Sequence, residues 1–154
     1  MVVETTAANE EVVVEGTDYS AHGLLFHVDA LESGDSVPYF DKAGNPRIMG
    51  AQDGRRLSKF SVTVKSLDGK TSFYTSNFLV MDSTGTSYEP QCPIDTYQNC
   101  KNGDSLESMY NPIIGQKKTG TLIFSTPASE KTISLIYKFS QKGPRVIKFN
   151  YNLA

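Results

Sequence analysis

Apolar and polar side chains alternate residue by residue through most of the apolar part of this chain. In TISLIYKF (132–139) the alternating apolar positions are Ile133, Leu135, Tyr137 and Phe139. Successive side chains of a β-strand point to opposite faces of its sheet, so a two-residue period predicts strands with one buried face. The same alternation recurs in three further segments, 23–31, 59–66 and 145–153.

Tight turns separate the alternating segments. Asp68-Gly69 predicts a β-hairpin between the two segments that flank it, because both central residues of a type I′ turn need positive φ. DSTGTSY (82–88) predicts a second tight reversal around Gly85. No long window has the period of about 3.6 residues that marks an amphipathic helix. The chain is therefore predicted to be all-β, an antiparallel β-sandwich of about seven to nine strands.

The stretch GQKKTGTL (115–122) has the G-x-x-x-x-G spacing that opens a phosphate-binding loop. That motif requires Lys and then Ser or Thr directly after its second glycine, followed by a helix whose N-terminal amides hold the phosphate. Here Thr121 and Leu122 follow Gly120, and the run that begins there stops at Pro127 like a strand. The sequence therefore predicts a strand at this point and argues against nucleotide binding.

Length and charge indicate one domain behind a polar lead-in. At 154 residues the chain is long enough to bury its own core. Residues 1–41 contain nine acidic side chains and no Lys or Arg, whereas the bases of the remainder are scattered. Scattered bases predict solvated surface and no nucleic-acid partner. We divide the chain into a flexible acidic lead-in, 1–18, interpreted as a former anchor or signal junction, and one β-sandwich domain, 19–154.

Two cysteines bear on the compartment. Cys92 and Cys100 enclose CPIDTYQNC, which has neither C-x-x-C spacing nor a second Cys/His pair to complete a zinc site. We interpret them as a disulfide, worth about 2–3 kcal/mol in the chain-entropy model, with two reduced cytosolic thiols as the alternative. A disulfide implies an oxidising compartment. No apolar run approaches the roughly 18 residues of a membrane-spanning helix, so we expect an exported protein that meets a membrane only through a removed N-terminal anchor.

Two longer stretches combine strands and turns in a set order: SKFSVTVKSLDGKTSFYTSNFLVMDSTGTSYEP and NPIIGQKKTGTLIFSTPASEKTISLIYKF. The first is similar to the strand, hairpin, strand and dG-x-x-Y turn, here Ser83, Gly85 and Tyr88, of a family of exported bacterial and archaeal domains of unknown function. The second resembles that family's tGtlvFevP strand and the strand after it, which ends in an aliphatic-Tyr pair. The family is related to the mycobacterial secreted immunoprotective extracellular proteins.

This resemblance covers about residues 57–139 and implies an immunoglobulin-like β-sandwich, an exported location and no catalytic role. Many members are lipoproteins or anchored surface proteins, which agrees with the anchor interpretation. The chain departs from the pattern at NPIIG, where Pro112 and Gly115 are separated, and in a longer cysteine-bearing insert, 89–110.

Histidines and acids give two metal-binding hypotheses. His22 and His27 are five residues apart, which places them on opposite faces of an uninterrupted strand, although a turn at Gly23 would bring them together. Three acids flank the cysteine loop without the D-x-D-x-D-G spacing of a calcium loop. These are Asp95, Asp104 and Glu107. Ordinary surface side chains are the alternative in both cases, and we predict no resident metal or cofactor.

Aromatic residues in two long loops are the remaining candidates for function. They are Tyr39 and Phe40 in 32–56, and Tyr88, Tyr97 and Tyr110 in 83–117. Loop aromatics on a rigid sandwich give a large contact area at low entropic cost, but they also pack under their own loops as small cores. Both interpretations stay open at this point.

The motifs of hydrolytic catalysis, G-x-S-x-G and H-E-x-x-H, do not occur. We therefore expect a non-enzymatic interaction module of the cell envelope or extracellular space, with a protein or glycan ligand. The alternative is a periplasmic or extracellular protein that binds a metal or a small ligand.

Overall fold

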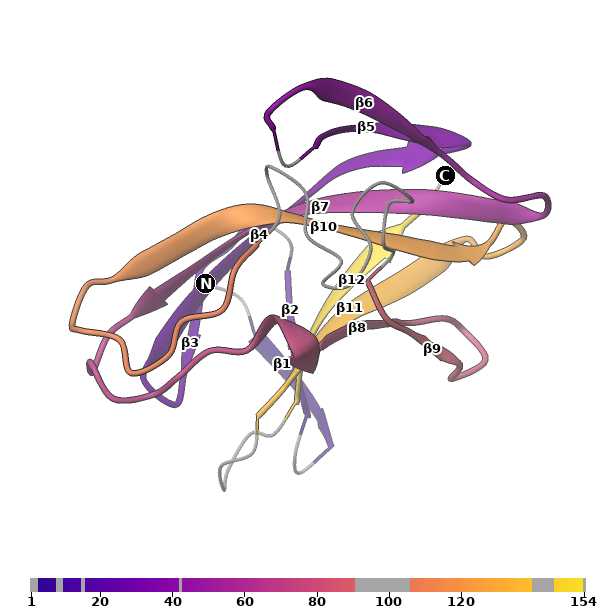
Figure 1. The fold of residues 1–154 in the computed structure, drawn as a ribbon. Coiled ribbons are helices and arrows are strands. Elements are labelled where there is room, and N and C mark those ends of the chain that lie inside the picture. Colours follow the sequence, from indigo (N-terminus) through magenta and orange to yellow (C-terminus); the bar gives the residue numbers. More distant parts are fainter. Residues whose placement is uncertain are drawn as a thin grey trace.

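The computed structural model describes residues 3–7, 10–14, 16–41, 43–90, 106–139 and 146–153. Within these ranges the chain forms twelve β-strands and one short 3-10 helix, η1 (Thr75–Asn77). The all-β prediction is confirmed, and the strands form two sheets and a separate hairpin (Figure 1). There are more strands than the seven to nine predicted, because two hairpins form in segments interpreted from sequence as a lead-in and a loop.

The first layer is a six-stranded sheet with the order β1-β2-β12-β11-β8-β9. Its strands are β1 (Val3–Ala7), β2 (Glu10–Val13), β8 (Phe78–Met81), β9 (Ser87–Tyr88), β11 (Thr132–Lys138) and β12 (Val146–Asn152). The second layer is a four-stranded sheet with the order β10-β7-β4-β3. Its strands are β3 (Tyr19–Ala21), β4 (Leu24–Gly34), β7 (Arg55–Ser66) and β10 (Lys117–Pro127). Neighbouring strands pair antiparallel, but β2 and β12 run parallel.

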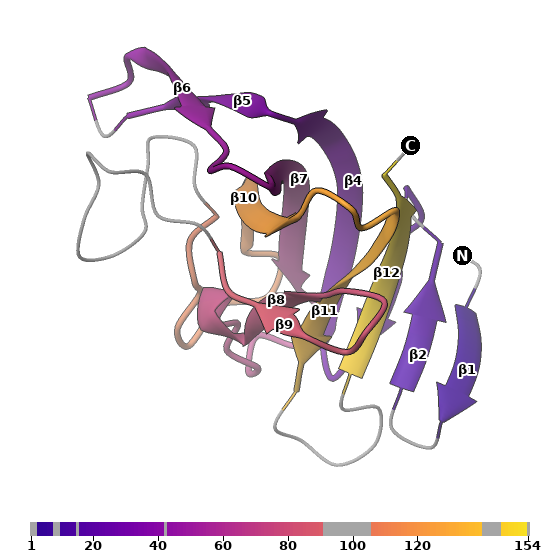
Figure 2. The same ribbon diagram turned by 90° about the vertical axis from the view of Figure 1, so that its right-hand side faces the viewer.

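The main hydrophobic core lies between the two sheets, which face each other in Figure 2. The alternating positions supply it, as the two-residue period predicts. At its centre the ring of Tyr137 lies 4.8 Å from that of Phe78, 5.1 Å from Phe26 and 5.5 Å from Phe73, measured between centroids. Each such buried ring stabilises the fold by roughly 1.5–3 kcal/mol through removal of apolar surface from water.

A second, smaller core lies on the outer face of the four-stranded sheet. The hairpin of β5 (Ser36–Phe40) and β6 (Pro46–Gly50) covers this face, so that Val37, Tyr39 and Met49 pack on Leu57 and Ile123. The Leu57 and Ile123 side chains belong to the outward-facing positions of β7 and β10. The long loop 32–56 of the sequence analysis is therefore largely a β-hairpin.

The N-terminal segment differs from the flexible lead-in over 1–18 that was predicted from the sequence. Residues 3–7 and 10–13 form β1 and β2, and β2 extends the six-stranded sheet by pairing parallel with β12. Val13 is 1% exposed and belongs to the main core. Three consecutive valines, 12–14, explain the strand, because β-branched residues favour extended backbone. The strand was not predicted from the sequence because the acidic composition of the segment favoured a solvated lead-in.

The Asp68-Gly69 turn does not form the predicted hairpin. Both edges of β7 are already paired, with β4 and β10, so the chain leaves the four-stranded sheet at this turn and continues into β8 of the other sheet. The reversal around Gly85 is confirmed, since it joins β8 to β9. The G-x-x-x-x-G stretch is also as expected: β10 starts at Lys117 and ends at Pro127.

Candidate functional site

Two segments from distant parts of the sequence run side by side at one end of the sandwich, beyond β7 and before β10. The backbones of Phe73 and Met109 exchange two hydrogen bonds, with N···O distances of 2.8 and 2.9 Å. The amide of Asn111 donates to Oγ of Ser72 at 3.1 Å. These bonds fix the loop before β10 against the segment that leads into η1.

Gly69 allows the two segments to approach closely. Its φ is +67°, and a Cβ atom there would lie 2.9 Å from the backbone nitrogen of Ile114. The amide of Gly115 donates to the carbonyl of Ser66 at 2.8 Å, which anchors the far side of the same turn. Gly69 was predicted from sequence as a turn glycine, and here it also provides room for the opposing backbone.

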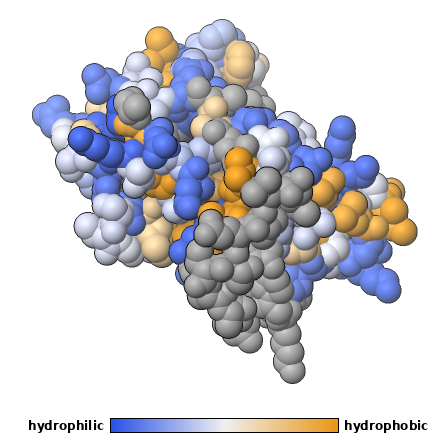
Figure 3. Space-filling model, turned by 180° about the vertical axis from the view of Figure 1, so that it is seen from behind, coloured by the Kyte–Doolittle hydropathy of each residue, from blue (hydrophilic) through white to orange (hydrophobic). Residues whose placement is uncertain are grey.

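Large hydrophobic side chains are concentrated on the surface of this end. Five of them form what we call the loop-end patch: Leu67 (44% exposed), Tyr74 (41%), Tyr110 (67%), Ile113 (72%) and Ile114 (74%). The Tyr74 and Tyr110 rings pack together at 5.5 Å between centroids. In Figure 3, hydrophobic atoms gather at the right-hand edge, which corresponds to the left end of Figure 1, where the turns after β7 and before β10 lie. Large contiguous patches of exposed apolar groups are candidates for interaction surfaces.

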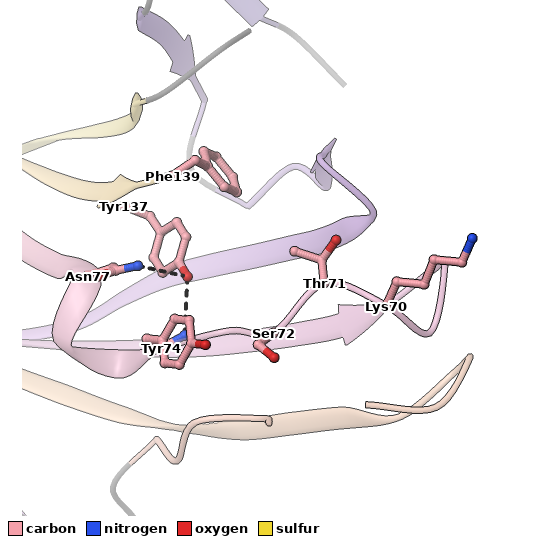
Figure 4. A pocket seen from close by; sticks show the side chains of 7 residues that line it. All are labelled: Lys70, Thr71, Ser72, Tyr74, Asn77, Tyr137 and Phe139. Carbon is pink, nitrogen blue, oxygen red and sulfur yellow. Dashed lines mark hydrogen bonds between the residues drawn. The ribbon is translucent and has the colours of Figure 1, made fainter. Parts of the chain in front are cut away.

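A pocket of about 280 Å³ opens beside the loop-end patch. It is lined by Lys70, Thr71, Ser72, Tyr74, Asn77, Tyr137 and Phe139. Figure 4 shows Tyr137 and Phe139 from β11 and its C-terminal extension on one side and the 70–74 segment on the other. Tyr74 belongs to both the pocket and the patch, so the two features form one continuous surface.

The hydroxyl of Tyr137 is one of the polar groups that line this pocket. Its oxygen accepts hydrogen bonds from the Tyr74 amide at 3.2 Å and from Nδ2 of Asn77 at 3.5 Å (Figure 4). Burial raises the pKa of Tyr137 above its ordinary value. The two hydrogen bonds lower this pKa, but the effect of burial is larger. The phenol is therefore neutral at physiological pH and keeps its proton.

The structure separates the aromatic residues predicted as binding candidates. Tyr39 is 7% exposed in the small core, and Tyr88 is half-buried with its hydroxyl donating to Asp82 at 2.8 Å, so both have the packing role that the sequence left open. Phe40 (45% exposed) and Tyr110 face solvent, but on different elements: Phe40 ends β5, while Tyr110 contacts Tyr74. Tyr97, like Cys92 and Cys100, lies outside the described residues.

The two histidines do not come together. His22, at φ 51° in the turn between β3 and β4, packs on the Phe139 ring at 4.6 Å. His27 points outward from β4, with Nδ1 2.7 Å from Asp18 and Nε2 3.0 Å from Asp29. The hydrogen bond with Asp18, assisted by Asp29, raises the pKa of His27 although partial burial opposes it.

The acids suggested for calcium give no site that can be described. Asp95 and Asp104 lie outside the described residues, and Glu107 is exposed. Within the ranges that the structure describes, no three His, Cys, Asp or Glu side chains are grouped so as to hold a metal ion.

One residue of the loop-end patch, Tyr110, was predicted from the sequence, but its neighbours were not. The sequence NPIIG carried a signal for Ile113 and Ile114, because they stand in a turn, where polar residues or glycine are usual. No sequence pattern pointed to Tyr74 or to the pocket, because the 70–77 segment contacts β11 only when the two sheets have packed together.

The fold and this surface define a β-sandwich domain with exposed apolar side chains gathered on its loops. Solved structures with a similar fold include an uncharacterized β-sandwich protein of Clostridium difficile 630 (TM-score 0.54, 14% identity, 94% of this chain and 97% of that chain). The secreted protein MPT63 of Mycobacterium tuberculosis is similar over 89% of this chain and 95% of its own (TM-score 0.53, 12% identity). A protein described as a putative lipoprotein, ycdA of Bacillus subtilis, matches 90% of this chain over 38% of its own length (TM-score 0.57, 14% identity).

No family model and no curated protein matches the chain. The likeness in fold to a secreted mycobacterial protein is confirmed by the structures, whereas membership of the family suggested by the sequence patterns stays a prediction. Among the described residues, no helix has the length and apolar character needed to cross a bilayer.

Proposed function

We propose that the protein is an exported, non-catalytic binding domain that recognises its ligand through the loop-end patch. The single observation that carries the proposal is the concentration of exposed tyrosine and isoleucine side chains on two segments that are tied together by backbone hydrogen bonds. A rigid backbone beneath large exposed side chains lowers the entropic cost of binding. Export is supported by the occurrence of this fold in a secreted protein and in the lipoprotein-like neighbour.

The exposure of the patch side chains is better explained by ligand binding than by packing within the fold. Ile113 and Ile114 expose more than two thirds of their surface, although the same loop buries Met109 almost completely. The loop thus has its own buried side chain, while these two isoleucines leave most of their surface in water. Large apolar side chains that are gathered on the surface and exposed to water are typical of surfaces that become buried in a complex.

The experiment measures binding of the purified protein to an immobilised panel of peptidoglycan, capsular polysaccharides, collagen and fibronectin. The test variant is Tyr110→Ser/Ile113→Ser, and the matched control is Phe40→Ser/Ile48→Ser, which removes exposed apolar groups from the β5–β6 hairpin. We expect at least one ligand to be lost by the test variant and kept by the control variant. Equal binding of every ligand by both variants, or no binding by the wild type, would overturn the proposal.

A small-ligand function is the second candidate, and the pocket beside the patch is the observation that favours it. Calorimetric titration with copper, zinc and calcium tests the metal form of this candidate. Absence of heat with all three metals removes that form and leaves an organic ligand.

A further inference from the structure

We propose that the pocket beside the loop-end patch is a subsite for one uncharged sugar ring of a glycan, with the Tyr74–Tyr110 pair as a platform for the next ring. The inference rests on the proposed binding function and names its ligand class. It follows from the hydrogen-bonding capacity of Tyr137, the size of the pocket, the character of its walls and the position of the nearby charges.

The Tyr137 hydroxyl can donate a hydrogen bond to a ligand. A phenol oxygen accepts two hydrogen bonds and donates one. Both acceptor positions are used, by the Tyr74 amide and by Asn77 Nδ2. Among the described residues this hydroxyl donates no hydrogen bond, so its proton is available to an oxygen atom in the pocket. Tyr137 is 1% exposed, and a buried donor without an acceptor is costly.

The size and walls of the pocket suit one ring. Its volume of about 280 Å³ lies just below the roughly 300–1,000 Å³ of drug-sized ligand sites, which fits a single ring. Phe139 and Tyr74 present aromatic surface, whereas Asn77, Thr71 and Tyr137 present polar atoms. A sugar ring needs this mixture, because its C–H faces pack on aromatic rings while its hydroxyls exchange hydrogen bonds at the edge.

The charges near the pocket favour an uncharged ligand. In Figure 4 the side chain of Lys70 extends from the rim towards solvent, so its ammonium group does not face the interior. The carboxylate of Asp68 is not part of the lining and accepts hydrogen bonds from the Lys70 and Thr71 amides at 2.8 and 3.1 Å. An ammonium ligand would therefore lose its hydration without meeting a carboxylate in the lining, and a carboxylate ligand would meet a cation only in Lys70.

An apolar or aromatic side chain of a peptide is a poorer occupant. It would fill the same volume but leave the Tyr137 proton without an acceptor, at a cost of about 1–3 kcal/mol. Tyr74 lines the pocket and packs on the exposed ring of Tyr110 at 5.5 Å between centroids, so aromatic surface extends beyond the lining. A chain of sugar rings makes use of this continuity, because each ring has a face that packs on an aromatic ring.

The test is an NMR titration of the ¹⁵N-labelled protein with the methyl glycosides of glucose, galactose, mannose and N-acetylglucosamine. Glucuronate and phenylalaninamide serve as the acidic and aromatic comparison ligands. We expect at least one neutral glycoside to shift the amide resonances of Tyr74 and Asn77 in a saturable manner, and neither comparison ligand to do so. Shifts caused by glucuronate or phenylalaninamide alone, or by none of these probes, would overturn the inference.

Variants separate the pocket from the fold and from the patch. Tyr137→Phe should weaken glycoside binding about three- to tenfold, the effect of one neutral hydrogen bond. Asn77→Ala is a second pocket variant in case Tyr137→Phe unfolds, and Tyr39→Phe is the matched control in the other core. Undiminished binding by both pocket variants contradicts the sugar subsite. Panel ligands that need Tyr110 but not Tyr137 would refute the subsite and leave the proposed function intact.

Discussion

Nδ1 of His27 lies 2.7 Å from Oδ1 of Asp18, and this pair connects the residue before β3 to the outer face of β4. The second ring nitrogen of His27 faces Asp29 at 3.0 Å. A neutral imidazole has only one N–H, so both contacts are satisfied as donated hydrogen bonds only when the ring is protonated. We therefore expect this edge of the sheet to be sensitive to pH near neutrality.

The first prediction concerns that sensitivity. The pKa of His27 is raised above its reference value of 6.5, chiefly by the Asp18 hydrogen bond. Its contribution to stability is therefore fully present below about pH 6.5 and is lost as the pH rises through the folded-state pKa. We expect thermal unfolding of the wild type and of His27→Gln to differ most at pH 5.5 and least at pH 8.5.

The size of this difference is about 1 kcal/mol or less, because the pair is partly exposed and screened by solvent. Asp18→Asn should reduce the same pH dependence, whereas Asp53→Asn, away from His27, should leave it unchanged. A constant difference between wild type and His27→Gln across this range would contradict the assignment.

The second prediction concerns the turn between β8 and β9. Asp82 accepts hydrogen bonds from the amide and hydroxyl of Thr84, the amide of Thr86 and the Tyr88 hydroxyl. These bonds, that of the Thr84 hydroxyl foremost, lower the pKa of Asp82. Asp82→Ala should lower the Tm by several degrees at pH 7, and the difference should shrink as the pH falls through the folded-state pKa.

Tyr88→Phe removes one of these bonds and should show part of the same loss. Calorimetry of both single variants and the double variant measures their coupling. Strict additivity of the two losses would show that the Tyr88 hydroxyl does not depend on the Asp82 carboxylate.

The third prediction concerns Gly69. An added Cβ would meet the backbone of Ile114 at 2.9 Å and would also force a side chain into positive φ. Gly69→Ala should therefore destabilise the protein by about 2–3 kcal/mol in urea unfolding. Gly44→Ala is the matched control, since it has a φ of +85° but nothing within 4 Å of the added Cβ, and should cost only about 1–2 kcal/mol. Equal losses of stability in the two variants would mean that the loop before β10 moves away from the added Cβ at no cost in free energy.

The fourth prediction concerns the β5–β6 hairpin. Its small core contains a handful of side chains, whereas the main core spans both sheets. We expect hydrogen exchange to show the hairpin opening at lower free energy than β7 or β11. Met49→Ala should lower the opening free energy of the hairpin by about 2 kcal/mol or more and leave exchange in β11 unchanged. Exchange of hairpin and core as one unit would contradict two separate cores.

The strands with a two-residue period could be predicted, but their partners could not. Ile133, Leu135 and Tyr137 were assigned to one face from their spacing, and all three are buried in the main core. The same spacing carries no information on sheet membership, so Asp68-Gly69 was interpreted as a hairpin although β7 already has two neighbours. Among site residues, Tyr110 could be found because it is an aromatic in a loop, whereas Tyr74 becomes part of a site only through contact with it.

By itself the sequence determined that this protein is built from extended segments with one buried face, because the position of each side chain relative to its strand depends only on its immediate neighbours. Which strands pair, where β2 joins the sheet and how Tyr74, Tyr110 and Tyr137 meet were decided by the tertiary structure. The reason is that hydrogen bonding between strands is made by backbone groups, which are chemically alike in every strand. Only the packing of the whole core selects one arrangement among them.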